Sequence, residues 1–132
     1  MNELSEVSAG GARQSPLNEY QGFLRRGQLA YQWDESTGRP VFYPRVIAPG
    51  SGSSQLSWRI SAGLGTVYSV TAISPKNEEP YNVALVDMDE GYRLMSRVEG
   101  IPADQVRIGM RVKVRVVDAG ADQSPYPVFD PA

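Results

Sequence analysis

The second half of the chain alternates between apolar and polar residues with a period of two, and this pattern constrains the fold more than any other feature. Turns that contain glycine or proline separate the alternating stretches. Successive side chains of a β-strand point to opposite faces, so the pattern predicts antiparallel strands with one buried and one solvated face. The predicted strands are 56–60, 66–73, 81–88, 92–98 and 110–116.

Five strands with one short helical connection, at 101–108, predict a mainly all-β fold built on a five-stranded Greek-key barrel of the OB type. We place this barrel at 55–132. The composition agrees, because 13 glycines and 10 prolines in 132 residues favour many turns and short strands over long helices.

A short amphipathic helix is predicted ahead of the barrel, at 17–27. Ser15 is a suitable N-cap, Pro16 fits the first helical position, and Gly27 ends the helix. The polar segment 1–16 is expected to be disordered. The apolar face of the helix carries Leu17, Tyr20, Phe23 and Leu24. A helix this short is not stable alone, so this face packs either on the rest of the chain or on a partner.

Residues 28–54 contain two turns with the spacing of zinc-binding knuckles. In each turn, two positions stand three residues apart and a glycine follows them. The positions are Asp34 and Thr37 in the first turn, and Ala48 and Ser51 in the second. Zinc sites use cysteine or histidine, and the chain has neither, so we predict no bound metal. From the residues alone, two ordinary Gly/Pro/Ser turns in a loop are the preferred explanation of the pattern.

The sequence offers little for catalysis by the chain alone. Without cysteine or histidine, it lacks the commonest nucleophile and the commonest general base. The densest acidic cluster, Asp87, Asp89 and Glu90, stands beside a glycine turn, where a solvated hairpin explains it. We therefore expect that the protein is not an enzyme and needs no cofactor.

Basic residues gather on two strand faces. Candidates for contact with a coenzyme A phosphate or with nucleic acid are Arg93 and Arg97 on one strand, and Arg111, Lys113 and Arg115 on another. Alternating charges are also typical of the wet face of a barrel. The net charge of −2 argues against a general nucleic-acid binder, because phosphate binding needs a clear excess of lysine and arginine.

Aromatic residues mark a candidate partner-binding surface. The candidates are Tyr20 and Phe23 on the helix, and Trp33, Phe42, Tyr43 and Arg45 in or beside the two turns. Segment 28–54 is too small to bury its aromatics by itself. Aromatic residues and arginine are enriched at interface hot spots, so they either bind a partner or pack back on the barrel.

Six short blocks occur in an order that resembles a known family. They are LAYQ at 29–32, FYPR at 42–45, LSW at 56–58, GLGTVYSVT at 63–71, VALVDMDEG at 83–91 and IGMRV at 108–112. The chain resembles the rubredoxin-like zinc-ribbon plus OB-fold proteins that accompany thiolases and related acyl-CoA enzymes, from Leu17 to its C-terminus. The resemblance maps the four zinc-binding cysteines of the family onto Asp34, Thr37, Ala48 and Ser51, so 28–54 is a degenerate, metal-free ribbon.

The resemblance implies a non-catalytic accessory subunit that docks on a thiolase-like, ketosynthase-like or hydratase-like enzyme and helps to form or bridge its acyl-CoA site. The alternative function is an OB-fold protein that binds single-stranded nucleic acid. No apolar run approaches the length of about 20 residues that spans a bilayer, and the first 16 residues lack the apolar core of a signal peptide. We therefore expect a cytoplasmic protein without membrane contact.

Overall fold

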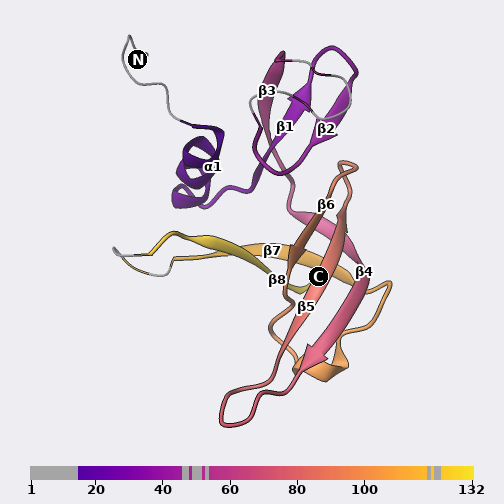
Figure 1. Cartoon of the computed structure of the whole chain (residues 1–132). Helices are drawn as coiled ribbons and strands as arrows, with labels where there is room; N and C mark the ends of the chain where they lie inside the picture. The colour runs from indigo at the N-terminus through magenta and orange to yellow at the C-terminus, as the bar shows by residue number, and fades with distance from the viewer. Residues whose placement is uncertain (1–14, 46–47, 49–51, 53, 119, 121–122) are drawn as a thin grey trace.

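The chain forms one helix and two β-sheets, seen in a computed structural model that describes residues 15–45, 48, 52, 54–118, 120 and 123–132. Helix α1 lies beside a three-stranded sheet, and both lie at one end of a five-stranded barrel (Figure 1). Most of the predicted disordered tail, 1–14, and the knuckle position Ser51 lie outside the described residues. None of the helices in the described part is long and apolar enough to cross a membrane.

Helix α1 (Pro16–Arg25) begins as predicted. The Ser15 hydroxyl oxygen accepts a hydrogen bond from the Asn18 N–H at 3.2 Å, and Pro16 takes the first position. The helix ends two residues before the predicted limit of 27, where the Gly27 N–H bonds to the Leu24 carbonyl oxygen at 2.9 Å. Its buried face packs on the core of the chain, which is one of the two outcomes that the sequence left open.

The three-stranded antiparallel sheet contains β1 (Ala30–Asp34), β2 (Arg39–Val41) and β3 (Leu56–Ile60) in the order β2-β1-β3. Our placement of 56–60 in the barrel was wrong, because β3 pairs with β1 along its whole length. Alternation predicts that a segment is a strand, but it carries no information about which strand lies beside it. The ribbon is therefore a three-stranded unit that β3 completes.

The five-stranded sheet has the order β6-β5-β4-β7-β8. Its strands are β4 (Leu64–Ile73), β5 (Tyr81–Met88), β6 (Arg93–Ser96), β7 (Arg111–Val117) and β8 (Tyr126–Pro131), and the 3₁₀-helix η1 (Ala103–Gln105) lies between β6 and β7. Strand β8 was not predicted, since its two prolines argue against a strand. Along its length, β8 pairs with β7 on one side. The prolines, which have no N–H group, are tolerated because the other side of the strand needs no regular ladder of hydrogen bonds.

The sheet closes into a barrel where β8 meets the chain after β6. Phe129 forms a parallel bridge with Val98. The Phe129 N–H donates to the Arg97 carbonyl oxygen at 2.9 Å, and the Phe129 carbonyl oxygen accepts from the Glu99 N–H at 2.7 Å. Five strands in this order, with a short helix before the fourth, form an OB-fold, and the predicted fold class is confirmed.

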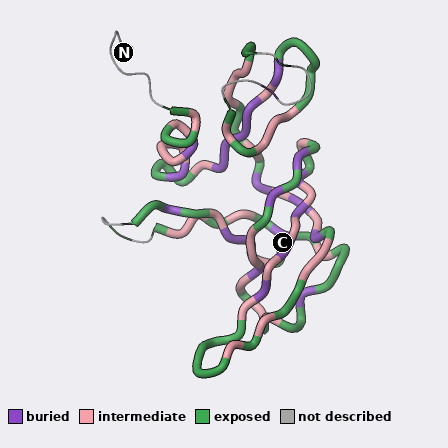
Figure 2. Tube along the Cα trace, in the orientation of Figure 1, coloured by how far each residue is buried: buried purple, intermediate pink, exposed green. Residues whose placement is uncertain are grey.

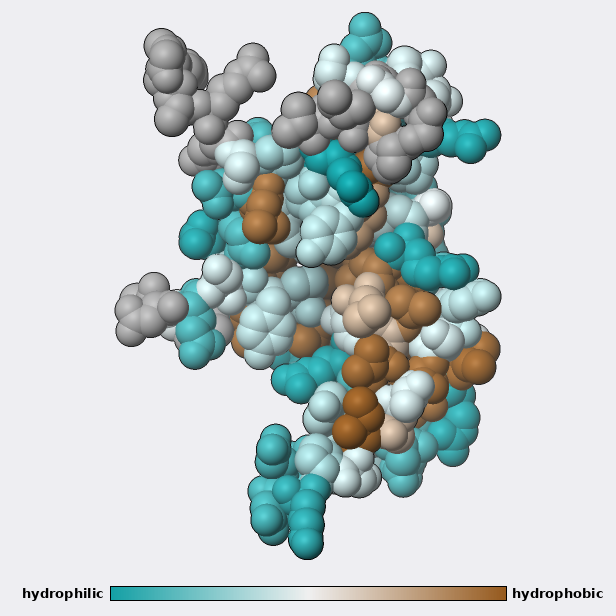
Figure 3. All heavy atoms as spheres, in the orientation of Figure 1, coloured by the Kyte–Doolittle hydropathy of each residue, from teal (hydrophilic) through white to brown (hydrophobic). Residues whose placement is uncertain are grey.

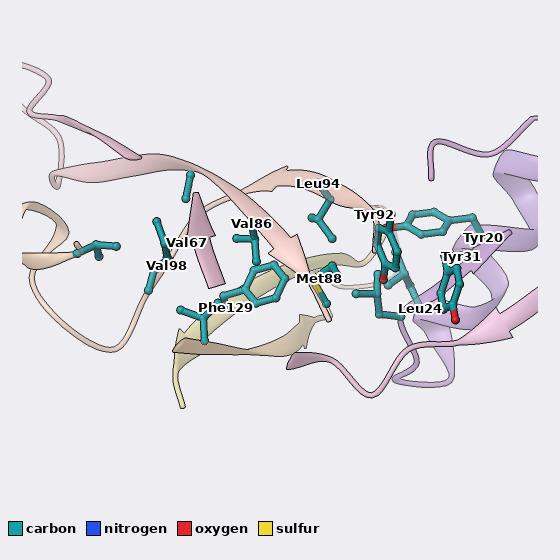
Figure 4. Packing of buried hydrophobic residues seen from close by; sticks show 14 residues of the cluster. Tyr20, Leu24, Tyr31, Val67, Val86, Met88, Tyr92, Leu94, Val98 and Phe129 are labelled. Atoms are coloured by element: carbon teal, nitrogen blue, oxygen red, sulfur yellow. The ribbon is translucent and has the colours of Figure 1, made fainter. Parts of the chain in front are cut away.

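One continuous core joins the barrel to the ribbon and the helix. Phe129 and Val86 fill the barrel, and the aromatic ring of Tyr92 continues the core toward Tyr31 and Tyr20 (Figure 4). Figure 2 shows buried segments where the two sheets meet and exposed ones at the hairpin tips. The ribbon is therefore held by shared apolar packing, the main stabilising contribution that a chain without metal ligands or disulfides has.

Candidate partner-binding groove

The two knuckle turns share one backbone hydrogen bond and one glycine, although neither turn carries a cysteine or histidine. The Gly38 N–H donates to the Asp34 carbonyl oxygen at 2.8 Å, and the Gly52 N–H donates to the Ala48 carbonyl oxygen at 3.0 Å. Gly38 and Gly52 adopt φ angles of 67° and 71°, in the left-handed region that favours glycine. Each turn therefore closes through one backbone hydrogen bond and one glycine.

Side-chain hydrogen bonds hold the first turn and the end of the ribbon. Asp34 is buried, and its Oδ1 accepts from the Ser36 N–H at 3.0 Å and from the Ser36 hydroxyl at 2.7 Å. Gln32, also buried, bonds both backbone groups of Arg45, at 2.8 and 2.6 Å. Within the described ranges, no three acidic side chains gather as metal ligands would. The polar side chains of Asp34 and Gln32 therefore stabilise the local backbone of the ribbon.

An aromatic stack joins the ribbon to the barrel. The rings of Phe42 and Tyr92 lie 5.0 Å apart at 11°, and Tyr31 stacks on Tyr92 at 4.8 Å. Tyr20 meets the edge of Phe42 at 5.8 Å. Burial raises the pKa of Tyr20 to about 12 and raises that of Tyr92 above its usual range, so both hydroxyls stay neutral. Of the expected partner-binding residues, Tyr20 is buried and Phe42 packs inward.

Two other expected partner-binding aromatics also have neighbours within the chain. The Phe23 ring lies 5.3 Å from that of Trp58. The guanidinium group of Arg59 lies 3.9 Å from the centre of the Trp33 ring, a cation–π contact on the ribbon. Phe23 and Trp33 are both half-buried in these contacts.

A groove separates β2 of the ribbon from β6 of the barrel. Its volume is about 880 Å³, and it is lined by β2, the residues after it, and β6. A second hollow of about 520 Å³ continues it toward α1 and β8. The two hollows share Phe42, Tyr43, Leu94 and Met95. They therefore form one surface feature, which we call the β2–β6 groove.

The β2–β6 groove gathers most of the large apolar side chains that the chain leaves exposed near the junction. Its exposed members are Leu17, Tyr43, Met95 and Tyr126. Figure 3 shows apolar side chains gathered below the three-stranded sheet, over β5 and β6. Exposed apolar patches of this kind mark interaction sites. Tyr43 was predicted as a partner-binding residue, and Leu17 was predicted on the apolar face of the helix. Met95 and Tyr126 were not predicted, because alternation does not show which strand faces stay uncovered.

Tyr43 is the most unusual residue of the groove. It is 70% exposed, and its backbone has a φ of 40°, which a tyrosine rarely adopts. Such strain persists where the surrounding structure imposes it, and it is typical of functional sites. Arg45 follows two residues later, is exposed, and also lines the groove. Tyr43 and Arg45 are therefore the two predicted partner-binding residues that the structure leaves accessible.

The four arginines of the predicted basic faces are engaged in ion pairs. The pairs are Arg93 with Asp87 at 2.6 Å, Arg97 with Glu99 at 2.9 Å, Arg111 with Asp89 at 2.7 Å, and Arg115 with both Asp130 and Glu99 at 2.8 Å. Hydrogen bonds from Arg111 lower the pKa of Asp89, and those from Arg115 lower the pKa of Asp130. Lys113 is exposed on the same strand as Arg111 and Arg115. The arrangement neutralises the faces that would contact phosphate.

The remaining acidic residue of the predicted hairpin cluster holds the link between the sheets. Glu90 accepts hydrogen bonds from the Ser61 hydroxyl at 2.8 Å and from the Ala62 N–H at 2.7 Å. These residues connect β3 to β4. The acidic cluster is thus a set of structural ion-pair and hydrogen-bond partners.

The fold and its groove define a class: a degenerate ribbon joined to an OB-fold. The model of the C-terminal OB-fold domain of ChsH2 matches residues 58–117. Among solved structures, the Ltp2–ChsH2(DUF35) aldolase resembles the chain with a TM-score of 0.77 and 30% identity, over 92% of this chain and 98% of that one. A DUF35 protein of unknown function from Sulfolobus solfataricus shares the fold, with a TM-score of 0.62 and 15% identity over 87% and 84%. The chain belongs to the ChsH2-type DUF35 family.

Two further relatives are described as hydratase subunits. A probable enoyl-CoA hydratase alpha subunit from Thermomonospora curvata is 39% identical over 67% of this chain. The 3-oxo-4,17-pregnadiene-20-carboxyl-CoA hydratase alpha subunit of Mycobacterium tuberculosis is 34% identical over 50% of it. The chain covers only 29% and 22% of the length of these two proteins.

The comparisons contradict the expectation that the protein is not an enzyme. The similar proteins are described as an aldolase and as hydratase subunits. The absence of histidine and cysteine opposes catalysis by this chain alone, but it does not oppose a contribution to a shared active site.

Proposed function

We propose that the chain is a subunit, or part of a subunit, of an acyl-CoA hydratase or aldolase complex, and that it docks on the enzyme through the β2–β6 groove. The observation that carries the proposal is the gathering of exposed Tyr43 and Met95 in a groove between ribbon and barrel. The descriptions of the relatives support the type of enzyme. A thiolase-like enzyme is a narrower candidate for the same role.

The proposed contribution to catalysis is to help form the acyl-CoA site at this interface. Tyr43 is held out of the surface by its backbone, and Arg45 stands beside it on the rim of the groove. A docked enzyme would bury both, and buried aromatic and arginine anchors supply much of the binding energy of an interface. The chain thus shapes and closes a site whose reacting groups lie mainly on the enzyme. A cytoplasmic location is part of this proposal.

Single-stranded nucleic-acid binding fits the structure less well. The arginines that would neutralise phosphates already bind carboxylates, and the net charge is −2. An oligonucleotide would have to replace several of these ion pairs at once. No observation favours that alternative over the docking role.

The test is coexpression of the chain with candidate hydratase, aldolase and thiolase-like subunits of its own genome, followed by copurification and assay with acyl-CoA. We expect one enzyme to copurify and its activity to depend on the chain. Tyr43→Ala and Met95→Ala should each weaken the complex, by about tenfold or more for a buried anchor. Ile108→Ala is the matched control, since Ile108 is 71% exposed and lies away from the groove. Salt-dependent oligonucleotide binding without any copurifying enzyme would disprove the proposal.

A further inference from the structure

The β2–β6 groove runs between two sheet edges, and we propose that an extended segment of the partner enzyme binds there as an added strand on β6. The segment carries apolar side chains flanked by carboxylates. The inference rests on the proposed function only in naming the enzyme as the partner. It adds the binding mode, which docking by itself does not require.

The first support is the edge of β6. In an antiparallel pair, alternate residues turn their backbone groups toward the partner strand or away from it. The Tyr92 carbonyl oxygen accepts from Met88 across the β5–β6 hairpin, whereas the Arg97 carbonyl oxygen points to the other side and accepts from Phe129 of β8. The same alternation turns the backbone groups of Arg93 and Met95 away from β5. From Ser96 onward β8 lies beside this edge, since the Ser96 hydroxyl donates to the Pro127 carbonyl oxygen at 2.8 Å; at Arg93 and Met95 the edge lines the groove.

The opposite wall is also an edge. β2 pairs with β1 on one side only and is terminal in its sheet. Pro40 lies in the middle of β2 and has no N–H, which blunts this edge for strand addition. β6 carries no proline, so it is the edge that can pair with a peptide backbone.

The second support is the apolar surface beneath this edge. Met95 is 69% exposed at the centre of the edge strand, a position where proteins commonly place a charged residue to prevent pairing. Phe42 and Leu94 line the same groove, and Tyr43 stands over it on a strained backbone. Side chains that alternate along an added strand would meet this surface at every second position.

The third support is the charge of the rim. Arg39 and Arg45 line the groove, and neither forms an ion pair with an acidic side chain in the part of the chain that the structure describes. The arginines on the barrel strands contrast with them, since Arg93 and Arg97 each hold a carboxylate. Two unpaired guanidinium groups beside an apolar groove are complementary to an acidic, apolar segment.

The experiment uses overlapping peptides of about 15 residues that tile the candidate hydratase, aldolase and thiolase-like subunits. Binding to the full chain is measured by fluorescence anisotropy. We expect binding peptides to be acidic and apolar, and to lose affinity by about tenfold or more when alternate backbone nitrogens facing β6 are N-methylated. N-methylation of the other nitrogens should have little effect. This comparison leaves the chain itself unchanged.

Variants of the chain test the same contacts. Arg39→Glu with Arg45→Glu should weaken peptide binding by about tenfold or more, while Lys76→Glu, at the distant β4–β5 turn, should not. Met95→Pro removes one outward N–H and should weaken binding more than Met95→Ala. Thermal unfolding checks that each variant folds, and if Met95→Pro does not, the N-methylated peptides decide.

The outcomes separate this inference from the proposed function. If an enzyme copurifies but no tile binds, or if binding is indifferent to the alternate N-methyl groups, strand addition is wrong and the docking role stands. If acidic, apolar tiles bind with the expected pattern but no enzyme copurifies, the groove is a strand-adding site and the proposed complex is wrong. Dimerisation of the chain through Met95 would also overturn the inference, since a second copy would then occupy the edge.

Discussion

The Phe42 ring, from the ribbon, lies 5.0 Å from the Tyr92 ring, from the barrel, with their planes 11° apart. In a ribbon with zinc, the metal holds the knuckles together. In this chain the two knuckles close by backbone hydrogen bonds, and the ribbon is attached to the barrel through this ring pair and its neighbours Tyr31 and Tyr20. The stack also forms the base of the β2–β6 groove, so it links stability to the proposed docking surface.

Phe42→Ala should lower the free energy of unfolding by about 3 kcal/mol, the lower end for a phenylalanine truncation because Phe42 is only partly buried. Phe42→Leu keeps most of the apolar volume and loses the ring contacts, so it should cost about 1 kcal/mol. Urea unfolding measures both. Equal losses for the two variants would show that ring stacking, not volume, attaches the ribbon.

Gly38→Ala should destabilise the protein by about 1–2 kcal/mol, because alanine is strained at a φ of 67°. Apart from its chain neighbours, no described atom lies within 4 Å of a Cβ added at Gly38, so backbone strain is the main cost. Gly22→Ala, inside α1, is the control and should stabilise by about 0.5–1 kcal/mol. Urea unfolding gives both values, and a neutral Gly38→Ala would mean that the first turn is not closed as described.

Tyr43→Asn should stabilise the isolated chain by about 0.5–1 kcal/mol while weakening the complex with its enzyme. Asparagine tolerates a positive φ better than tyrosine, and the exposed Tyr43 ring loses little packing when it is removed. Thermal unfolding and copurification report the two effects. A loss of stability would show that the ring serves the fold of the isolated chain.

Asp89→Asn should lower stability at neutral pH, and the difference from the wild type should vanish in acid. Arg111 lowers the pKa of Asp89 in the folded state, so this contribution is complete above the unfolded value of about 3.9 and is lost as the pH falls through the folded pKa. Thermal unfolding between pH 7 and pH 2 measures the difference. Asp104→Asn, on η1, is the control for an exposed carboxylate without an ion pair in the described structure. A difference that persists at pH 2 would rule out the ion pair as its cause.

Chelators should leave the melting temperature unchanged. Ribbons with zinc gain folding free energy from their metal and lose it when the metal is removed. This chain has no cysteine or histidine to supply the ligands. Thermal unfolding with and without EDTA, together with elemental analysis, tests the prediction, and stoichiometric zinc would contradict it.

The ribbon and the barrel were predictable to different degrees. The period of two located β4, β5 and β7 within one or two residues, because one face of each strand is buried. The same pattern gave the wrong neighbour for β3, since pairing depends on contacts between segments far apart in the chain. β8 was not predicted because the cost of a proline in a strand depends on whether a neighbouring strand needs its N–H group as a hydrogen-bond donor.

The sequence by itself determined that the chain is mainly β, that it has no cysteine or histidine, and that a ribbon precedes an OB-fold, since these follow from periodicity, composition and block order. Only the tertiary structure decided which aromatic residues remain available. Tyr20 and Phe42 are packed by the junction between the sheets, whereas Tyr43 and Met95 stay exposed. It also paired Arg111 with Asp89, whereas Arg39 and Arg45 form no ion pair with an acidic side chain among the described residues. Burial and charge pairing depend on which surfaces the fold brings together, and a local sequence pattern does not specify those contacts.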